Sequence, residues 1–256
     1  MSRWRVDINC DMGEGYGVWQ LGEDEALLPH ISSANIACGF HAGDASVMRR
    51  TVRAAAARGV AIGAHPGLPD RAGFGRRRMQ VTPEEIYDIC VYQIGALLGH
   101  ARAAGVPLAH VKPHGALYNM AAADRALAAA VAAAVHDVDN ALTLFGLAGS
   151  VLVSEGERAG LLVAAEAFAD RAYEPDGSLT PRDRPGAVIA DPAAAADRAL
   201  RMVVDGVVAT SAGTDFDLVA DTICVHGDSP HAVRIARKLR AVLESAGVRI
   251  AAPGQP

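Results

Sequence analysis

The N-terminal stretch WRVDINCD, residues 4–11, alternates apolar and polar side chains position by position. In an extended strand, successive side chains point to opposite faces, so Val6 and Ile8 share one face and Asp7 and Asn9 share the other. Charged and amide groups on one face of an otherwise apolar strand are typical of a strand that lines the lumen of a barrel. We therefore expect Asp7 and Asn9 to point into the interior of a closed sheet.

The rest of the chain repeats the same kind of unit. Apolar runs rich in β-forming residues alternate with alanine-rich stretches of helical period, which indicates βα units wound around a parallel sheet. The seven predicted strands cover residues 4–9, 31–37, 60–64, 108–112, 142–145, 161–166 and 223–226, and residues 207–210 form a weaker extra candidate. With 256 residues, the chain suits a single domain, residues 1–256. The sequence predicts an α/β fold with a parallel barrel.

Capping signals predict the helices between these strands. Residues 82–85, Thr-Pro-Glu-Glu, combine an N-cap, a first-turn proline and a capping-box glutamate, and Gly105 closes this helix. The alanine run at residues 126–134 has one apolar stripe and is expected to pack on the barrel. Three further helices with similar signals are predicted at residues 44–59, 191–206 and 229–247.

Composition excludes several classes of partner. The 24 Lys plus Arg against 29 Asp plus Glu leave a net charge of −5 and no basic stripe of the kind that nucleic acid requires. No apolar stretch has the length of a signal peptide core or a membrane span, so a soluble, cytoplasmic protein without a membrane partner is expected. The four cysteines are scattered, which favours free thiols.

Polar residues gather where the predicted strands end, and in parallel α/β barrels the active site is built at these carboxyl ends. Six of the seven strand ends contribute, and only the fifth, ending at Phe145, adds nothing evident. The residues concerned are Asp7, Asn9, Cys10, Asp11 and Glu14; Asn35, Cys38 and His41; His65; Lys112 and His114; Glu166, Asp170 and Arg171; and His226 and Asp228. Long connections at residues 10–30, 65–80 and 167–190 are expected on the same face.

Lys112 is one of only two lysines in the chain, and the other, Lys238, lies on a predicted helix. An unpaired buried charge costs several kcal/mol, so Asp7 and Lys112 are expected to pair or to share a ligand. A lysine inside a barrel suggests a point charge for a carbonyl or phosphate oxygen, or a Schiff base, and its polar surroundings favour the first.

The arginines fall into two groups. The loop at residues 73–78 contains three consecutive arginines, and a solvated basic loop is the favoured interpretation. Arg171 and Arg182, in the long connection after the sixth strand, are better candidates for binding a substrate carboxylate. The sequence has no Walker motif and no dinucleotide fingerprint, so it offers no recognised way of holding ATP.

Six segments, which contain most of these strand-end residues, resemble one known family. They are residues 6–17, 31–44, 63–67, 110–119, 168–173 and 224–228. The chain is similar to the LamB/YcsF family of 5-oxoprolinase A subunits, and the likeness extends from residue 6 to about residue 246. The resemblance implies a seven-stranded, TIM-like (β/α) barrel of the glycoside hydrolase and polysaccharide deacetylase type. It also implies ATP-dependent opening of 5-oxoproline to glutamate, with ATP as co-substrate and subunits B and C as partners.

The lactam chemistry suggests roles for the candidate residues. Lys112 and Arg171 would stabilise charge on the lactam oxygen or on phosphate, and Asn9 and Asn35 would orient the lactam N–H and C=O. Activation of water is assigned to one of Asp11, His41, His65 and His114. The catalytic candidates are therefore Asp11, His41, His65, Lys112 and His114. The substrate-binding candidates are Asp7, Asn9, Asn35, Glu166, Asp170, Arg171, Arg182, His226 and Asp228.

Two other functions stay open from the sequence. Asp11 or Asp7, with His41 and His65, could hold a divalent metal ion that activates water in a deacetylase-like hydrolase. About one equivalent of zinc, cobalt or manganese in the purified protein, together with loss of activity on treatment with a chelator, would distinguish this function. Alternatively, the barrel could be a non-catalytic subunit that binds a small acid for its partners, although so many titratable groups at six strand ends argue for catalysis.

Overall fold

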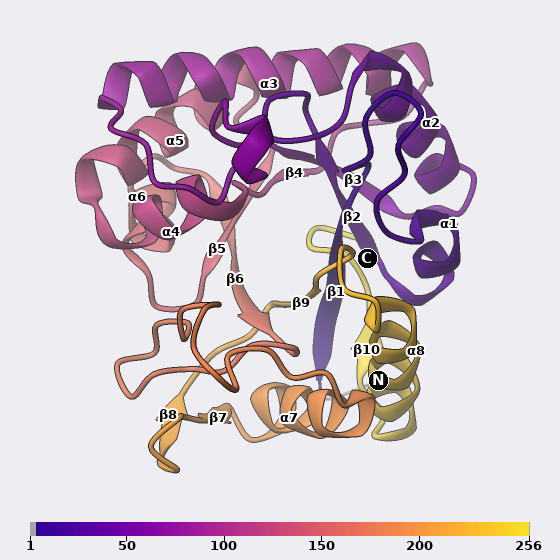
Figure 1. Ribbon diagram of the computed structural model, residues 1–256, viewed down its shortest axis with the longest axis vertical. Coiled ribbons are helices and arrows are strands. Elements are labelled where there is room, and N and C mark those ends of the chain that lie inside the picture. The colour runs from indigo at the N-terminus through magenta and orange to yellow at the C-terminus, as the bar shows by residue number, and fades with distance from the viewer. Residues whose placement is uncertain (1–3, 256) are drawn as a thin grey trace.

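In the computed structural model, which describes residues 4–255, seven parallel strands close into a barrel surrounded by helices (Figure 1). The barrel closes because β1 pairs with β2 on one side and with β9 on the other. Its strands are β1 (Arg5–Met12), β2 (Ser33–Ala37), β3 (Ala61–His65), β4 (His110–Val111), β5 (Thr143–Leu147), β6 (Leu162–Phe168) and β9 (Thr222–Val225). The predicted fold class is confirmed.

The two faces of β1 follow the predicted alternation. Ile8 and Met12 are fully buried in the apolar layer between the barrel and its helices. Asp7, Asn9 and Asp11, on the other face, are almost fully buried and turn toward the lumen, where they bond side chains of other strands. The barrel interior is therefore polar, and the apolar core forms a ring outside it.

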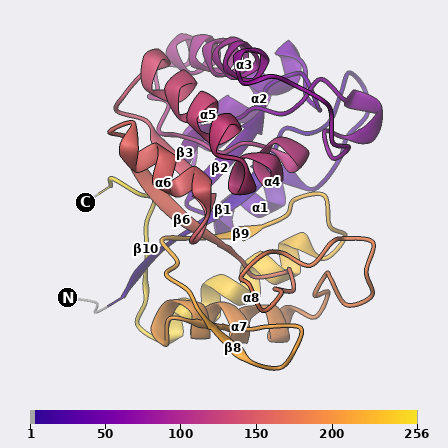
Figure 2. The same cartoon turned by 90° about the vertical axis from the view of Figure 1, so that its left-hand side faces the viewer.

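The helices lie outside the barrel, with α7 and α8 together on one side and α3 and α5 on the opposite side (Figure 2). The long helices are α2 (Ala45–Ala56), α3 (Pro83–Ala103), α5 (Arg125–Val138), α7 (Pro192–Val204) and α8 (Ala232–Ser245). The shorter helices are α1 (Asp24–Leu27), α4 (Gly115–Ala123), α6 (Val151–Arg158) and the 3-10 turns Leu28–His30 and Arg71–Gly73. Within residues 4–255, none of these helices has both the length and the apolar character of a membrane span.

The predicted caps are present at three helices. Thr82 and Glu85 form a capping box, Asp44 accepts two backbone N–H groups of α2, and Asp191 accepts one of α7. The prediction that α8 begins at Ser229 was wrong. The Ser229 hydroxyl accepts the backbone N–H of His231 in a turn, so the helix begins later, at Ala232.

Four short strands differ from the sequence prediction. The candidate at residues 207–210 is a strand, β7 (Val207–Ala209), but it lies outside the barrel and pairs antiparallel with β8 (Asp215–Asp217). The two-residue strand β10 (Arg249–Ile250), which was not predicted, pairs with the start of β1. In β4 the regular ladder covers only His110 and Val111, since Pro113 has no N–H to extend it.

Candidate functional site

A cavity of about 610 Å³ opens at the carboxyl ends of the strands. It is lined by residues at or just beyond the ends of β1, β3, β4, β5, β6 and β9, which brings together segments far apart in the sequence. Seven of the predicted site residues line it, namely Asp11, His65, Lys112, His114, Arg171, Arg182 and His226. Asp7, Asn9, Asn35, His41, Glu166, Asp170 and Asp228 are not among the lining residues. The predicted residues therefore form two layers, one facing the cavity and one supporting it.

Lys112 lies at the floor of the cavity among several acceptors. Its Nζ is 3.0 Å from Asp11 Oδ1 and 2.8 Å from Glu166 Oε1, and it also donates to Asn9 Oδ1 and Cys224 Sγ. Burial alone would lower the pKa of Lys112, but the negative charges, with Asp11 the strongest, raise it well above its usual value. Lys112 is therefore a fixed ammonium group.

Asp11 connects Lys112 to the histidines. Its Oδ1 bonds Lys112, and its Oδ2 lies 3.3 Å from His65 Nε2. Burial would raise the pKa of Asp11, but His65 and Lys112 together hold it well below its usual value. Asp11 is thus a charged carboxylate at the edge of the cavity.

The predicted pair of Asp7 with Lys112 was wrong. Asp7 is bound by three hydroxyl groups, those of Ser32, Ser33 and Thr222, at 2.6–2.8 Å. Burial raises the pKa of Asp7 to about 6 despite these hydrogen bonds. Asp7 lies deeper in the barrel than the cavity and holds neighbouring strands together.

Asn9 and Asn35 also lie below the cavity, so the structure does not place them to orient a lactam. Asn9 donates to Glu166 Oε1 and Thr222 Oγ1, while its Oδ1 accepts from Asn35 and Lys112. Asn35 donates to Asp11 as well, and its own Oδ1 lies 2.7 Å from His110 Nε2. Since Asn9 uses its full hydrogen-bonding capacity here, the two amides position Lys112, Asp11 and Glu166.

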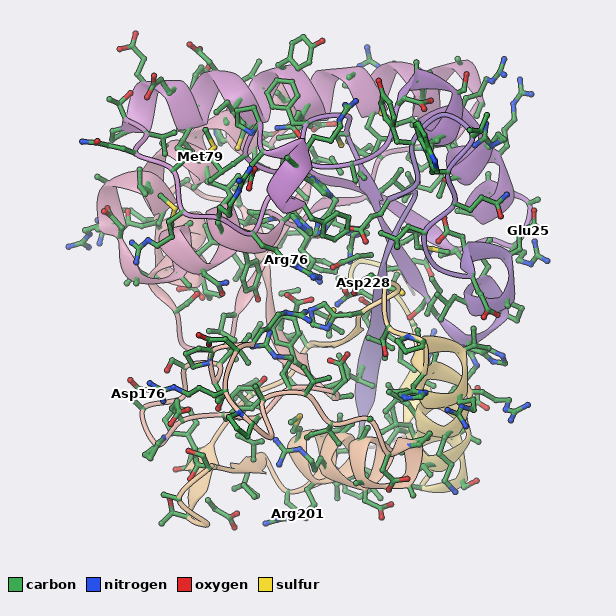
Figure 3. The ribbon with its side chains drawn as sticks, in the orientation of Figure 1. Glu25, Arg76, Met79, Asp176, Arg201 and Asp228 are labelled. Carbon is green, nitrogen blue, oxygen red and sulfur yellow. The ribbon has the colours of Figure 1, made fainter. Side chains whose placement is uncertain are left out.

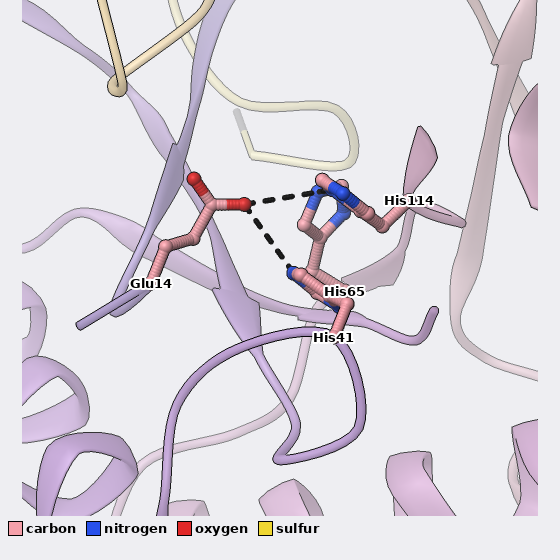
Figure 4. Close-up of side chains that lie close together, drawn as sticks. All are labelled: Glu14, His41, His65 and His114. Carbon is pink, nitrogen blue, oxygen red and sulfur yellow. Dashed lines mark hydrogen bonds and ion pairs between the residues drawn. The ribbon is translucent and has the colours of Figure 1, made fainter. Parts of the chain in front are cut away.

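Three histidines and Glu14 form a compact cluster beside Asp11 (Figure 4). His65 Nε2 lies 2.9 Å from His114 Nδ1, and Glu14 Oε1 lies 3.5 Å from His114 Nδ1 and 3.3 Å from His41 Nε2. Burial lowers the pKa values of His41 and His114 well below the usual value. His41 is stacked on His114 behind the cavity, so it does not line the cavity as a catalytic base would.

The loop glycines make room for this cluster. A Cβ on Gly67 would lie 2.5 Å from His41 Nδ1, and a Cβ on Gly75 would lie 2.9 Å from His114 Cδ2. Gly75 also has a φ of +64°, a conformation that other residues rarely adopt. The segment after β3 can pack against the two imidazoles because it has no side chains at these positions.

His226 forms a second supported histidine at the cavity wall. Its Nδ1 lies 3.0 Å from both carboxylate oxygens of Asp170, and its ring stacks on Phe168. Burial would raise the pKa of Asp170, but the His226 charge and hydrogen bonds lower it below its usual value. Asp170 therefore orients His226.

The arginines differ in part from the sequence prediction. Arg171 and Arg182 line the cavity as expected, and Arg171 donates to the carbonyl oxygens of Thr180 and Ala187, which holds the loop after β6. Arg76, assigned to a solvated basic loop, also lines the cavity and pairs with Asp228 at 2.7 Å (Figure 3). Its neighbour Arg77 pairs with Asp70 instead.

The predicted metal set of Asp11, His41 and His65 does not form one group. Among the described residues, the potential ligand atoms converge as Glu14, His41, His65 and His114, and separately as Asp11, Cys224 and His226. Asp11 groups with Cys224 and His226, although its Oδ2 also lies 3.3 Å from His65 Nε2. Glu14 and His114 are the two members that the predicted metal set left out, although both follow strands.

A closed parallel barrel that gathers a buried lysine, carboxylates and histidines into one cavity defines a (β/α)-barrel protein with an enzyme-type site. The chain belongs to the LamB/YcsF family, whose sequence pattern matches residues 6–256. This family assignment confirms the resemblance found in the sequence motifs.

Relatives and solved structures support the same assignment. The chain is 59% identical to the 5-oxoprolinase A subunit of Tolumonas auensis, over 97% of this chain and 99% of that protein. It is 55% identical to the 5-oxoprolinase A subunit of Bacillus subtilis, over 97% of each. The crystal structure of a lactam utilization protein from Thermus thermophilus superposes with a TM-score of 0.92 at 50% identity, over 97% of this chain and 99% of that one.

A more distant likeness concerns the fold alone. The catalytic domain of a peptidoglycan N-acetylglucosamine deacetylase from Eubacterium rectale has a TM-score of 0.52 and 11% identity, over 98% of this chain and 90% of that one. The barrel is therefore of the deacetylase type, as the resemblance implied.

Proposed function

We infer that this chain is the A subunit of a 5-oxoprolinase and that its cavity opens the lactam ring of 5-oxo-L-proline to give L-glutamate. Relatives that are 55–59% identical over nearly their whole length carry this name, and the similar Thermus protein is described as a lactam utilization protein. The observation that carries the proposal is the fixed ammonium group of Lys112 at the cavity floor.

The cavity offers groups that suit both ends of a small lactam acid. Three arginines line it, Arg76, Arg171 and Arg182, and each can bind a carboxylate. Lys112 offers a positive charge to the lactam oxygen from the floor. 5-Oxoproline carries one carboxylate and one ring carbonyl, so it matches this distribution of charge.

ATP is the proposed co-substrate. The lactam is resonance-stabilised, so its hydrolysis needs an external driving force. Phosphorylation of the lactam oxygen would supply it, giving ADP and phosphate as further products. Lys112 and Arg171 would then stabilise the negative charge on the lactam or phosphoryl oxygen.

Activation of water is assigned to the groups that face the cavity. Asp11, His65 and His114 line it, whereas His41 lies behind His114 and is a positioning residue. Asp11 is held as a carboxylate and lies 3.3 Å from His65 Nε2, which supports a role for this pair in activating water.

Partner subunits B and C are part of the proposal. The relatives are named as the A subunit of 5-oxoprolinase, which implies an assembly of several different chains. The absence of a Walker motif from the sequence agrees with a reaction in which partners contribute to ATP binding. No observation favours the deacetylase function or the purely binding function over this proposal.

The test is glutamate release from 5-oxoproline and ATP in three mixtures: this chain alone, subunits B and C alone, and all three together. The proposal predicts glutamate only when this chain is present with its partners. Glutamate release by subunits B and C alone, at the rate of the full mixture, would remove this chain from the reaction.

A further inference from the structure

His65 and His114 point two unprotonated ring nitrogens toward each other. His65 Nδ1 lies 2.6 Å from the carbonyl oxygen of Lys112, and His114 Nε2 lies 2.8 Å from the carbonyl oxygen of Phe74. A carbonyl oxygen only accepts, so both of these nitrogens carry the ring proton. In the neutral rings, His65 Nε2 and His114 Nδ1 therefore carry no proton, and each has a lone pair. These two nitrogens nevertheless lie only 2.9 Å apart. Two acceptors this close need a cation between them.

Glu14 supplies a carboxyl oxygen at the same point, although burial raises the pKa of this group well above its usual value in the absence of an ion. Its Oε1 lies 3.5 Å from His114 Nδ1, and its side chain is almost fully buried. Ligand atoms bound at about 2.0–2.1 Å in a tetrahedral zinc site lie about 3.3 Å from one another. The distances of 2.9 Å and 3.5 Å lie on either side of this value, so small adjustments would accommodate an ion.

The ring planes separate ligands from supporting residues. An imidazole lone pair lies in the plane of its ring, and the His65 and His114 planes cross at 87°, so their lone pairs can meet at one point. The His41 ring is parallel to His114 within 2° at 3.7 Å, and two parallel planes share no point. His41 therefore cannot bind the same ion in this arrangement. Its Nε2 proton is placed to donate to Glu14 Oε1 at 3.3 Å instead.

We propose that Glu14, His65 and His114 hold a divalent ion of the zinc class, with His41 as the positioning residue that orients Glu14. Two histidines and one glutamate with an open fourth position form a recognised zinc ligand set, and donation of the other ring N–H to a backbone carbonyl is usual for metal-binding histidines. Such an ion supplies a Lewis acid for a carbonyl or phosphoryl oxygen in the cavity. The site rests on this geometry and not on the identity of the substrate.

Cobalt titration of the chelator-treated full chain tests the site without any activity measurement. One equivalent of Co²⁺ should give visible d–d bands of a four- or five-coordinate ion, and X-ray absorption of the zinc-loaded wild type should show two imidazole ligands. If the wild-type protein binds no stoichiometric Co²⁺ or Zn²⁺, the proposal is overturned. The contact between His65 Nε2 and His114 Nδ1 is then explained by a proton shared between the two rings.

Variants identify the ligands. Glu14→Gln, His65→Ala and His114→Ala should each lose Co²⁺ binding, and His41→Ala should bind about 10–100-fold more weakly, as expected of a supporting residue. His136→Ala, at an exposed position on α5, is the matched control and should bind as wild type does. Circular dichroism checks that each variant is folded. Folded Glu14→Gln and His114→Ala proteins with wild-type affinity would show that the ion is bound elsewhere.

Discussion

Lys112→Met removes the ammonium group that pairs with two buried carboxylates at the cavity floor. Asp11 and Glu166 lie 3.0 Å and 2.8 Å from Lys112 Nζ, and both side chains are at most 8% exposed. Methionine fills a similar volume but carries no charge. The variant therefore leaves two acids buried without their common partner.

Breaking one buried ion pair by removing a partner costs about 3–5 kcal/mol, so a loss of stability of this size is expected at neutral pH. For a domain of this size it corresponds to about 6–20 °C in Tm. Without Lys112, the pKa of Asp11 rises, so Asp11 takes up a proton as the pH falls. The stability gap between wild type and variant should therefore narrow between pH ~7 and pH ~4.

Urea unfolding followed by circular dichroism at several pH values measures this gap. Lys238→Met is the matched control, because Lys238 is the other lysine, lies exposed on α8, and should change stability by less than about 0.5 kcal/mol. If Lys112→Met is as stable as Lys238→Met at pH 7, or if its deficit is unchanged in acid, Lys112 does not neutralise the two acids as described.

Three further predictions concern local structure. Gly67→Ala sets a Cβ 2.5 Å from His41 Nδ1, so thermal unfolding should show a loss of about 1–3 kcal/mol. By contrast, a Cβ added at Gly99 in α3 would meet no atom within 4 Å, so Gly99→Ala should stabilise the protein by about 0.4–1 kcal/mol. Equal changes in stability for the two variants would contradict the close packing at Gly67. The pKa of Asp7 is raised to about 6 in the folded protein. The contribution of Asp7 to the free energy of unfolding should therefore fall by about 3 kcal/mol as the pH rises from ~4 to ~6. An NMR titration of the Asp7 carboxyl group with a midpoint below pH ~4 would refute this prediction. Thr82→Ala removes the capping box of α3 and should lower the free energy of unfolding by about 1 kcal/mol. An unchanged urea midpoint would contradict this prediction.

The sequence predicts the barrel and much of the cavity because both follow from periodicity. Alternation in residues 4–11 gives the face of each β1 side chain, and all seven strands appear as apolar runs. Parallel strands end at one rim of the barrel, so residues such as His65 and Lys112, which end or follow different strands, meet there without any further information.

Depth along the barrel is what periodicity leaves undetermined. Asp7 and Asp11 are on the same face of β1, but they are four residues apart, or about 13 Å at the usual rise of a strand. Only the strand register shows that Asp11 is level with Asn35 and that Asp7 is level with Thr222. The choice of Asp7 as the partner of Lys112 failed for this reason.

Loops set a second limit. Glu14 and Arg76 lie in connections, where no period fixes the direction of a side chain, and neither was chosen as a site residue. Arg76 looked like part of a solvated basic run, yet it turns toward Asp228 across 152 positions of sequence. A long-range ion pair of this kind has no signal in a single sequence.

We propose that the chemistry of ring opening takes place in this cavity. The most direct measurement is the rate of glutamate formation from 5-oxoproline and ATP by the assembled enzyme carrying His65→Ala, compared with His136→Ala. We expect a loss of about a hundredfold or more for His65→Ala and wild-type turnover for His136→Ala. Undiminished glutamate formation by a folded, assembled His65→Ala enzyme would show that ring opening does not depend on this cavity.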